Sequence, residues 1–209
     1  MDLKYFDLKA ILDMDDMFRR YFMNTAEGFK NAALLGTANS DGLTNLAIFN
    51  SVVHIGASPP LIGFIHRPVT VPKQTFTNIQ QTGSFTINLI TKGIYKKAHQ
   101  TSARYAPDIS EFEATDLQAE FGRKVKAPYV AESPVRFGMS LEEIIPIRSN
   151  GTYLVIGKVQ EMFIRKDLIA DDGNVELHKA DIIAVSGLDN YYLPELIERL
   201  PYAKVPATT

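Results

Sequence analysis

The residues between Arg67 and Thr75 have the types and spacing of a binding site for a phosphate group. Pro72 suits the first position of a helix, where its missing N–H costs nothing, so the sequence predicts that a helix starts there. The amides of Lys73, Gln74 and Thr75 would then be unpaired at the positive end of the helix dipole, which favours an anion. Lys73 and Thr75 add side-chain donors, and Arg67 can donate two parallel hydrogen bonds. An ordinary capped surface helix would have the same pattern, so both interpretations stay open.

The charges around this segment favour an anionic ligand. No Asp or Glu occurs between Asp41 and Asp108, although the chain has 24 acidic residues in 209. At that average density the interval would contain about seven or eight acidic residues, so the deficit is informative even though strands are acid-poor. The same interval contains the basic residues Arg67, Lys73, Lys92, Lys96, Lys97 and Arg104.

Strands are predicted to hold this segment in place. Residues 32–37 and 45–55 have the composition of paired strands, and the Asp-Gly pair in the turn at 39–42 is a strong hairpin signal. Residues 61–65 are predicted as a short buried strand entered through two prolines.

Asn45, Asn50 and Ser51 interrupt the second of these strands, whose other residues are mostly apolar. A polar side chain on a buried strand costs free energy unless it is hydrogen-bonded. The interruption therefore predicts a β-bulge, or a place where a ligand takes the position of a neighbouring strand. Bonding to a nearby turn would account for these side chains equally well, so both alternatives stay open.

The remaining elements are predicted from local patterns. The lack of a regular βαβ alternation favours a mainly β fold with added helices, an antiparallel barrel formed by residues 1–209 as a single domain. The expected strands are 84–90, 135–147, 152–165 and 182–186, and turns are expected at 148–151 and 171–174. The expected helices are 73–81, which ends at Gly83, and 92–105. Ser110 is expected to begin a capping box, and residues 117–126 have a composition typical of the surface.

Helices are also predicted near both ends of the chain. Residues 13–23 form an amphipathic helix with Asp13 as its N-cap, and residues 194–200 form a closing helix. The apolar stripe of the first helix is expected to pack in the core rather than to bind a cofactor. This stripe consists of Met14, Met17, Phe18, Tyr21 and Phe22.

Composition excludes several classes of function. The absence of cysteine excludes disulfides, thiolate catalysis and iron–sulfur clusters. A net charge of −2 argues against a nucleic acid partner. No secretory signal and no membrane-spanning window is found, so a cytoplasmic protein without a membrane partner is expected. No nucleophile elbow, P-loop or dinucleotide fingerprint occurs, and His54, His66, His99 and His178 are not spaced as metal ligands, so no metal site is predicted.

The motifs follow one another in a recognisable order. They are Asp41-Gly42, Asn45 with Asn50-Ser51, Pro59-Pro60-Leu61, Arg67-Pro68, Lys73-x-Thr75-x-x-Asn78-Ile79 and Thr82-Gly83-x-Phe85-x-Ile87-Asn88, followed by Ser110-Glu111-Phe112, Ala127-Pro128, residues 131–134 and 155–159. Over roughly residues 31–192 this order resembles the flavin reductase-like family, the FMN-binding split barrels related to the flavoredoxins.

The resemblance implies a Greek-key split β-barrel that forms a homodimer and binds FMN near the subunit interface. It implies that residues 45–52 line the isoalloxazine ring, largely through backbone groups, and that Arg67, Lys73 and Thr75 bind the phosphate. Asn88 and residues 92–105 would border the flavin or the partner subunit. The cofactor-binding residues implied in this way are Asn45, Ala47, Ile48, Phe49, Asn50, Ser51, Val52, Arg67, Lys73, Gln74, Thr75, Asn88, Leu89 and Ser102.

The sequence departs from the family pattern at a few positions. Gln74 stands where the family often has Asp, Arg67 is single where a pair is common, and Met139 replaces a frequent Cys. Residues 186–189 replace an Arg-containing segment. These departures leave the preference for NADH or NADPH and for an acceptor open.

The function that the resemblance implies is flavin reduction by NAD(P)H, with hydride transfer to flavin N5. FMN would carry the chemistry, so no catalytic side chain is predicted. The electron acceptor would be a small molecule or a protein, and FMN could be a prosthetic group or a released substrate. Two alternatives stay open: an electron-transfer flavoprotein with fixed FMN and no nicotinamide turnover, and a non-redox ligand-binding β-barrel.

Overall fold

Seven antiparallel strands form the central sheet, in the order β3–β2–β6–β9–β10–β5–β4. The computed structural model describes residues 1–68 and 73–205. The strands are β2 (Ala33–Ala38), β3 (Thr44–Phe49), β4 (Val52–Ala57), β5 (Pro60–His66), β6 (Ser84–Leu89), β9 (Val135–Ile147) and β10 (Thr152–Ile164).

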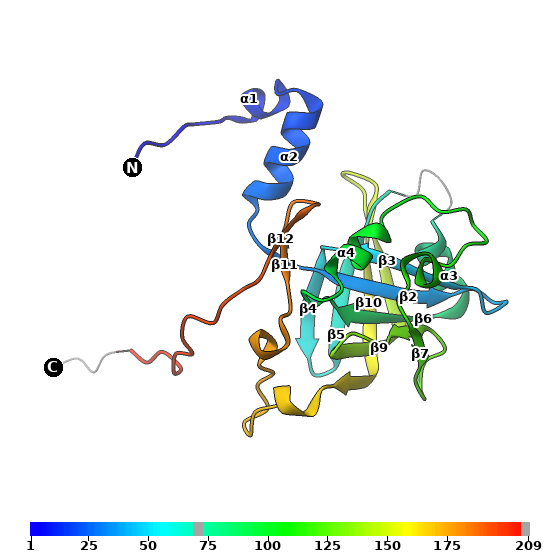
Figure 1. The fold of residues 1–209 in the computed structure, drawn as a ribbon. Helices are drawn as coiled ribbons and strands as arrows, with labels where there is room; N and C mark the ends of the chain where they lie inside the picture. The colour runs from blue at the N-terminus through cyan, green and yellow to red at the C-terminus, as the bar shows by residue number, and fades with distance from the viewer. Residues whose placement is uncertain (69–72, 206–209) are drawn as a thin grey trace.

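β3 and β4 follow each other in the chain but lie at opposite edges of this sheet. Only Asn50 and Ser51 join them. Such a link spans roughly 11 Å at most between the flanking Cα atoms. The sheet must therefore curl until its two edges meet at this end, which gives an incompletely closed barrel (Figure 1). The prediction of a mainly β antiparallel barrel with added helices is confirmed.

Helices and two smaller sheets accompany the barrel. β1–β11–β12 form one sheet and β7–β8 the other. The helices α1 and α2 and the C-terminal segment extend away from the barrel (Figure 1). The bounds of these elements are α1 (Leu8–Leu12), α2 (Asp16–Ala26), β1 (Lys30–Asn31), α3 (Gln74–Thr82), α4 (Tyr95–Gln100), α5 (Glu111–Thr115), β7 (Ala119–Phe121), β8 (Pro128–Val130), η1 (Lys166–Leu168), η2 (Leu177–Ala180), β11 (Ala184–Ser186) and β12 (Asn190–Tyr192).

The turn between β2 and β3 forms as predicted. The Asn39 side-chain oxygen accepts hydrogen bonds from the amides of Asp41 at 3.0 Å and Leu43 at 2.9 Å. Gly42 has φ +87°, a left-handed conformation that other residues adopt only with strain. This turn pairs Thr37 with Asn45, which fixes the register of the two strands.

Apolar side chains gather in two clusters. The first includes Leu35, Phe64, Phe85, Met139 and Val155, together with residues from α3. The second includes Leu34 and Leu46 and is covered by α4 and α5, which contribute Ala98 and Phe112. β2 contributes to both clusters, because successive side chains point to opposite faces of a strand.

Three sequence predictions are wrong in the centre of the chain. Residues 45–55 form two strands that pair with different partners, β3 with β2 and β4 with β5. The helix at 92–105 is restricted to α4. The segment 117–126 is not entirely at the surface, since Leu117 and Val125 are buried.

The capping box at Ser110 does not form. The Ser110 hydroxyl lies 2.7 Å from that of Thr44, and α5 has no side-chain cap. Glu111, one residue later, is buried and binds β3. Both side chains are thus used in tertiary contacts that a local pattern cannot reveal.

The N-terminal helix differs from its prediction. Asp13 is the C-cap of α1, whereas Asp15 is the N-cap of α2 and its side chain accepts from the amides of Met17 and Phe18. The apolar stripe is not in the core, because neither helix contains a buried residue.

The closing helix predicted at 194–200 is absent, and these residues are irregular and exposed. A helix of two turns without a packing surface is too short to be stable in water.

Candidate functional site

The outer edge of β3 leads directly into the crossing to β4. The amide of Leu46 points away from β2 and donates a 2.9 Å hydrogen bond to the buried carboxylate of Glu111. Because amide direction alternates along a strand, the amide of Ile48 points to the same open edge. Ala47, Ile48, Phe49 and Val52 are all half-buried. A flat ligand placed along this edge could therefore reach backbone donors and apolar side chains.

Asn50 and Ser51 form the crossing itself. The Asn50 side-chain amide donates to the carbonyl of Gly187 at 2.6 Å, and the Ser51 hydroxyl donates to the Asn50 side-chain oxygen at 3.2 Å. The Ser51 carbonyl accepts from the amide of Ile65 at 3.1 Å. Contact with a neighbouring turn, one of the two alternatives left open for Asn50, is therefore present.

The start of α3 brings positive charge toward this region. Lys73 is the N-cap, its side chain makes no capping hydrogen bond, and the first turn of α3 has no acidic residue. Lys73 and Arg67 are both exposed. The helix begins at Gln74, and the predicted role of Pro72 lies outside the described residues. An exposed lysine, an exposed arginine and the amides of a helix start are together suited to a phosphate group.

A buried hydrogen-bond network fixes α3 to the barrel. The Asn45 amide donates to the Thr75 hydroxyl at 3.0 Å and to the Thr37 hydroxyl at 3.2 Å, and the Asn78 amide donates to the same Thr37 hydroxyl at 3.1 Å. All four side chains are buried. Because such groups are costly when unpaired, the network holds the helix start in one position against β3.

Gln74 lines a small cavity beside this network. Its side-chain amide donates to the carbonyl of Pro107 at 2.8 Å. The cavity has a volume of about 110 Å³, and its lining comprises Asn39, Leu43, Thr44, Asn45, Gln74, Asn78 and Pro107. The predicted site residues Asn45 and Gln74 are thus brought together.

His66 is a buried residue of this region that the sequence interpretation set aside. Its ring lies 4.8 Å from that of Phe76 and 6.2 Å from that of Phe49, between centroids. Burial lowers the pKa of His66 and the charge of Lys73 lowers it further, against an opposing effect of the Arg67 backbone. The His66 Nδ1 atom is buried and has no hydrogen-bond partner within residues 1–68 and 73–205.

Three predicted site residues lie elsewhere. Asn88 is fully buried, donates to the Leu34 carbonyl and the Thr86 hydroxyl, and accepts from the Val130 amide. Leu89 belongs to the core, and the exposed Ser102 donates to the His99 carbonyl. The structure therefore gives Asn88 and Leu89 a role in the fold and does not bring them to the open edge of β3.

Three residues of this region are not predicted from the sequence: Thr37, Asn78 and His66. The hairpin register would have indicated Thr37, because the turn at Gly42 places it opposite Asn45. Asn78 follows Thr75 by three residues and so lies on the same face of a helix. His66 gave no signal beyond its position beside Arg67.

A second, larger cavity lies away from these residues. Its volume is about 790 Å³, and residues from the ends of β9 and β10, including Arg136 and Phe163, line it. None of the predicted site residues contributes to it. No group of His, Asp or Glu side chains suited to a metal ion occurs in the described part of the chain. The described helices are too short or too polar to cross a membrane.

Comparison with known proteins places this geometry in context. A model of the flavin reductase like domain matches residues 26–176. A candidate flavin reductase with a split barrel domain from Shewanella frigidimarina is 44% identical, with a TM-score of 0.92 over 96% of this chain and 100% of that chain. Component B of nitrilotriacetate monooxygenase from Bacillus cereus has a TM-score of 0.84 at 20% identity, over 96% of this chain and 100% of that one. Flavoredoxin of Desulfovibrio vulgaris has a TM-score of 0.73 at 22% identity, over 84% and 92% of the two chains.

Proposed function

The chain belongs to the flavin reductase like family, and we propose that it is an oxidoreductase that binds FMN at the crossing from β3 to β4 and reduces it with NADH or NADPH. The observation that carries this proposal is the hydrogen bond from Asn45 to Thr75, which holds the start of α3, with the exposed Lys73 at its N-cap, against β3. FMN needs both features, a cationic pocket for its phosphate and a surface for its ring.

The residues at the start of α3 fit the phosphate of FMN. Arg67 and Lys73 offer exposed cations, and the first amides of α3 offer donors without a competing acidic side chain. Burial lowers the pKa of His66, and its buried Nδ1 atom has no hydrogen-bond partner among the described residues. Thr75 supports this pocket indirectly, since its hydroxyl accepts from Asn45 and so fixes the helix start.

The open edge of β3 fits the isoalloxazine ring. Backbone amides of an edge strand remain unpaired unless a side chain or a ligand accepts from them. The side chain of Glu111 accepts a hydrogen bond from the amide of Leu46. The amide of Ile48, further along the same edge, is therefore the proposed donor for a flavin. Phe49 and Val52 supply half-buried apolar walls at the crossing.

When bound, FMN supplies the hydride acceptor for NAD(P)H, and the protein supplies placement and electrostatics. The amides along β3 would hold the ring and donate to the negative charge that reduction places on it. The half-buried walls would limit contact with water. Because reduction does not change the phosphate, these contacts would bind oxidised and reduced FMN equally. They would therefore contribute to FMN affinity rather than to the rate of reduction.

We expect the protein to act as a homodimer with the flavin near the subunit interface. Asn50, at the crossing, binds Gly187, and Gly187 in turn contacts the end of α2. The proposed flavin region is thus joined to elements that project from the barrel. Sedimentation of the purified protein measures the oligomeric state directly.

The function is tested by titration and by turnover. The purified protein is titrated with FMN under a visible absorption and fluorescence readout, and then mixed with NADH or NADPH in air in the presence of FMN. We expect saturable FMN binding and oxidation of one of the nicotinamides above the protein-free rate. FMN binding without nicotinamide oxidation would instead support an electron-transfer flavoprotein, and no flavin uptake would contradict the proposal as a whole.

A further inference from the structure

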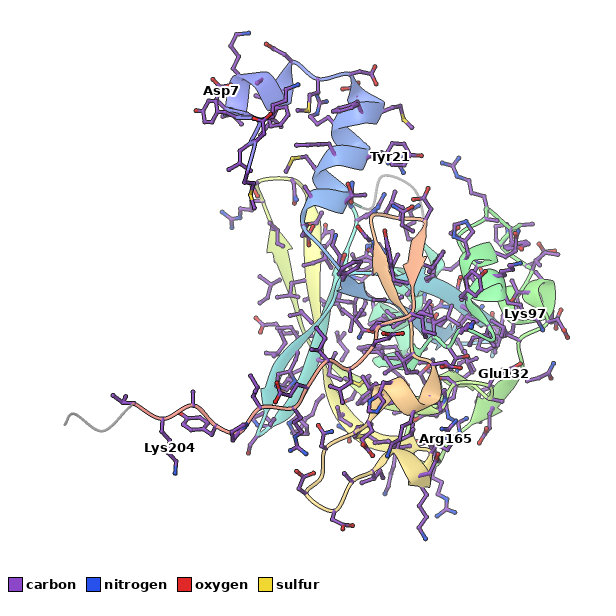
Figure 2. All side chains as sticks on the ribbon, turned by 60° about the vertical axis from the view of Figure 1, so that its left-hand side comes forward. Asp7, Tyr21, Lys97, Glu132, Arg165 and Lys204 are labelled. Atoms are coloured by element: carbon purple, nitrogen blue, oxygen red, sulfur yellow. The ribbon has the colours of Figure 1, made fainter. Side chains whose placement is uncertain are left out.

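The cavity of about 790 Å³ where β9 begins and β10 ends, here called the β9–β10 cavity, has the size of a ligand site. Pockets that bind small molecules have volumes of roughly 300–1,000 Å³. The loops that follow β6 and β8 and the end of η2 complete its wall. Figure 2 shows two of the lining residues, Glu132 and Arg165, on the same side of the barrel. None of the residues proposed above to bind FMN lines this cavity, so a ligand here would be a second one.

The cavity has two arginines in its wall, and one of them is already occupied. The Nε and Nη2 atoms of Arg165 donate to the two carboxylate oxygens of Asp167 at 2.7 Å and 3.0 Å. Its Nη2 atom also donates to the carbonyl of Lys179 at 3.0 Å. Arg136 is therefore the cation of this wall that is better placed to bind a ligand.

Arg136 is held in a fixed position. Its Nη1 atom donates to the carboxylate of Glu120 at 2.6 Å. Its guanidinium carbon lies 5.0 Å from the ring centroid of Phe163 and 5.9 Å from that of Tyr129. The side chain is only 14% exposed. Because these contacts fix the guanidinium before a ligand arrives, a ligand that pairs with it loses less entropy on binding.

One donor of this guanidinium has no acceptor. The Nε atom of Arg136 is buried and has no hydrogen-bond partner within residues 1–68 and 73–205. Buried donors are nearly always paired, because an unpaired one is costly. Glu120 binds Nη1, whereas the edge formed by Nε and Nη2 is one to which a carboxylate can bind through two parallel hydrogen bonds. A carboxylate at this edge would supply the missing acceptor.

The rest of the wall suits an apolar body attached to such a carboxylate. Ala131, Pro134, Phe163 and Ile164 line the cavity beside the guanidinium. Met162 lines it too and is 45% exposed. A methionine side chain is unbranched and adapts its shape, so Met162 can shift to admit a ligand to the buried edge of the guanidinium.

Glu132 and Asp181 decide which kind of anion fits. Both are exposed and line the cavity. Glu132 is held by the amide of Gln118, which donates to its carboxylate oxygens at 3.1 Å and 3.2 Å. A phosphate monoester carries a charge of about −1.5 to −2 at neutral pH, which two neighbouring carboxylates would repel. A carboxylic acid carries one negative charge, so the wall favours a monocarboxylate over a phosphate.

We propose that the β9–β10 cavity is a second ligand site and that it binds a small carboxylic acid with an apolar body. The carboxylate pairs with Arg136, and the body packs against Phe163 and Met162. This site goes beyond the proposed function, because it uses neither the crossing from β3 to β4 nor the start of α3.

Isothermal titration calorimetry of the full-length protein tests this assignment, with benzoate as the probe. Benzamide has nearly the same shape without the charge, and inorganic phosphate has the charge without the apolar body. We expect saturable binding of one benzoate per chain. Benzamide and phosphate should each bind at least roughly 10-fold more weakly, because each lacks one of the two features that the wall recognises.

Three variants locate the benzoate. Arg136→Lys keeps the positive charge beside Glu120 but cannot form two parallel hydrogen bonds, so it should bind benzoate roughly 10-fold more weakly. Met162→Glu places a negative charge in the cavity and should weaken binding by a similar factor. Arg148→Lys, at an exposed position beyond the other end of β9, is the matched control and should bind as the wild type does. Far-UV circular dichroism checks that every variant is folded.

Three outcomes would overturn the proposal. Without saturable benzoate binding, the cavity would not accept the proposed class of ligand. If benzamide bound as tightly as benzoate, or phosphate more tightly, the cavity would not recognise a carboxylate. Unchanged benzoate affinity in both Arg136→Lys and Met162→Glu would place the benzoate elsewhere.

A flat aromatic anion also resembles a ligand of the proposed flavin region, and two further titrations distinguish the two sites. We expect Lys73→Ala to bind benzoate as the wild type does, and excess FMN to leave benzoate binding unchanged. Loss of benzoate binding in either titration would assign the benzoate to the flavin region and overturn the proposal. Because the benzoate titration itself needs no flavin, it can succeed where FMN binding fails, so the two proposals are tested separately.

Discussion

The side-chain amide of Asn45 on β3 donates a 3.0 Å hydrogen bond to the hydroxyl of Thr75 in the first turn of α3. This contact joins the strand proposed to carry the flavin ring to the helix proposed to carry its phosphate. Because both side chains are buried, the bond fixes the distance between the two halves of the site. Preorganisation of this kind reduces the entropy that a ligand loses on binding.

Replacement of Asn45 by Ala should therefore lower both stability and FMN affinity. The change leaves the Thr75 hydroxyl without its donor and removes one donor to Thr37, which should reduce the free energy of unfolding by about 1–3 kcal/mol. Urea denaturation measures this loss. Ser40→Ala, in the exposed turn beside the same strands, is the control and should leave stability unchanged. If Asn45→Ala and the wild type had the same free energy of unfolding, the network would not contribute to the stability of the fold.

Lys73 and Arg67 should contribute to FMN affinity through the phosphate alone. Each is exposed, so Lys73→Ala and Arg67→Ala should not affect the fold. Loss of a charge-assisted hydrogen bond should weaken FMN binding roughly 10-fold or more. Fluorescence titration with FMN and with riboflavin, which lacks the phosphate, measures the difference.

The control for these two variants is Lys92→Ala, an exposed lysine in the same acid-poor interval. It should bind both ligands as the wild type does. If Lys73→Ala and Arg67→Ala weakened riboflavin as much as FMN, the phosphate would have to lie elsewhere.

Local cues in the sequence were sufficient for much of the fold. Gly83 ends α3 in a left-handed conformation, and the hairpin between β9 and β10 forms where Asn150-Gly151 indicates a turn. Such features depend on the conformational preferences of a few adjacent residues. They are therefore visible without knowledge of the rest of the chain.

Long-range pairing was not visible in the same way. The break at Asn50 and Ser51 separates strands that lie at opposite edges of the sheet, which depends on the curl of the whole barrel. The same limit applies to Asn88, a polar residue on a buried strand that resembled a ligand contact. Its bonds to Leu34 and Val130 depend on elements more than 40 residues away.

Helix α2 shows a third limit. The apolar spacing in α2 predicts a helix with one apolar face, but it does not show whether the rest of the chain covers that face. Phe18, which is predicted to lie in the core, is 58% exposed.

Glu161 should stabilise the protein less as the pH falls. Burial alone would raise its pKa, but hydrogen bonds from the amides of Lys124, Arg123 and Val125 and from the Tyr129 hydroxyl outweigh that effect and lower the pKa below 4.5. The stabilisation is therefore present above the unfolded pKa and lost as the pH falls through the folded pKa. The stability advantage of wild type over Glu161→Gln, measured by urea denaturation, should shrink in this range. An advantage that does not change with pH would contradict this assignment.

Glu111 should show the opposite pH dependence. Burial raises its pKa above 4.5, although the hydrogen bonds from the amide of Leu46 and from its own amide act in the other direction. A raised folded pKa means that the native state favours the protonated acid. The contribution to stability is then complete below the unfolded pKa and is lost as the pH rises through the folded pKa.

The variant Glu111→Gln isolates this effect, because the amide oxygen of Gln can still accept from Leu46 but carries no charge. The free energy of unfolding of Glu111→Gln, minus that of the wild type, should rise with pH between the unfolded-state and the folded-state pKa of Glu111. Above the folded-state pKa this difference should stay constant. Urea denaturation at a series of pH values, with Glu161→Gln as the paired variant of opposite sign, measures both slopes in one experiment. If the two variants changed with pH in the same direction, the charge of Glu111 would not be buried against β3 as the structure has it.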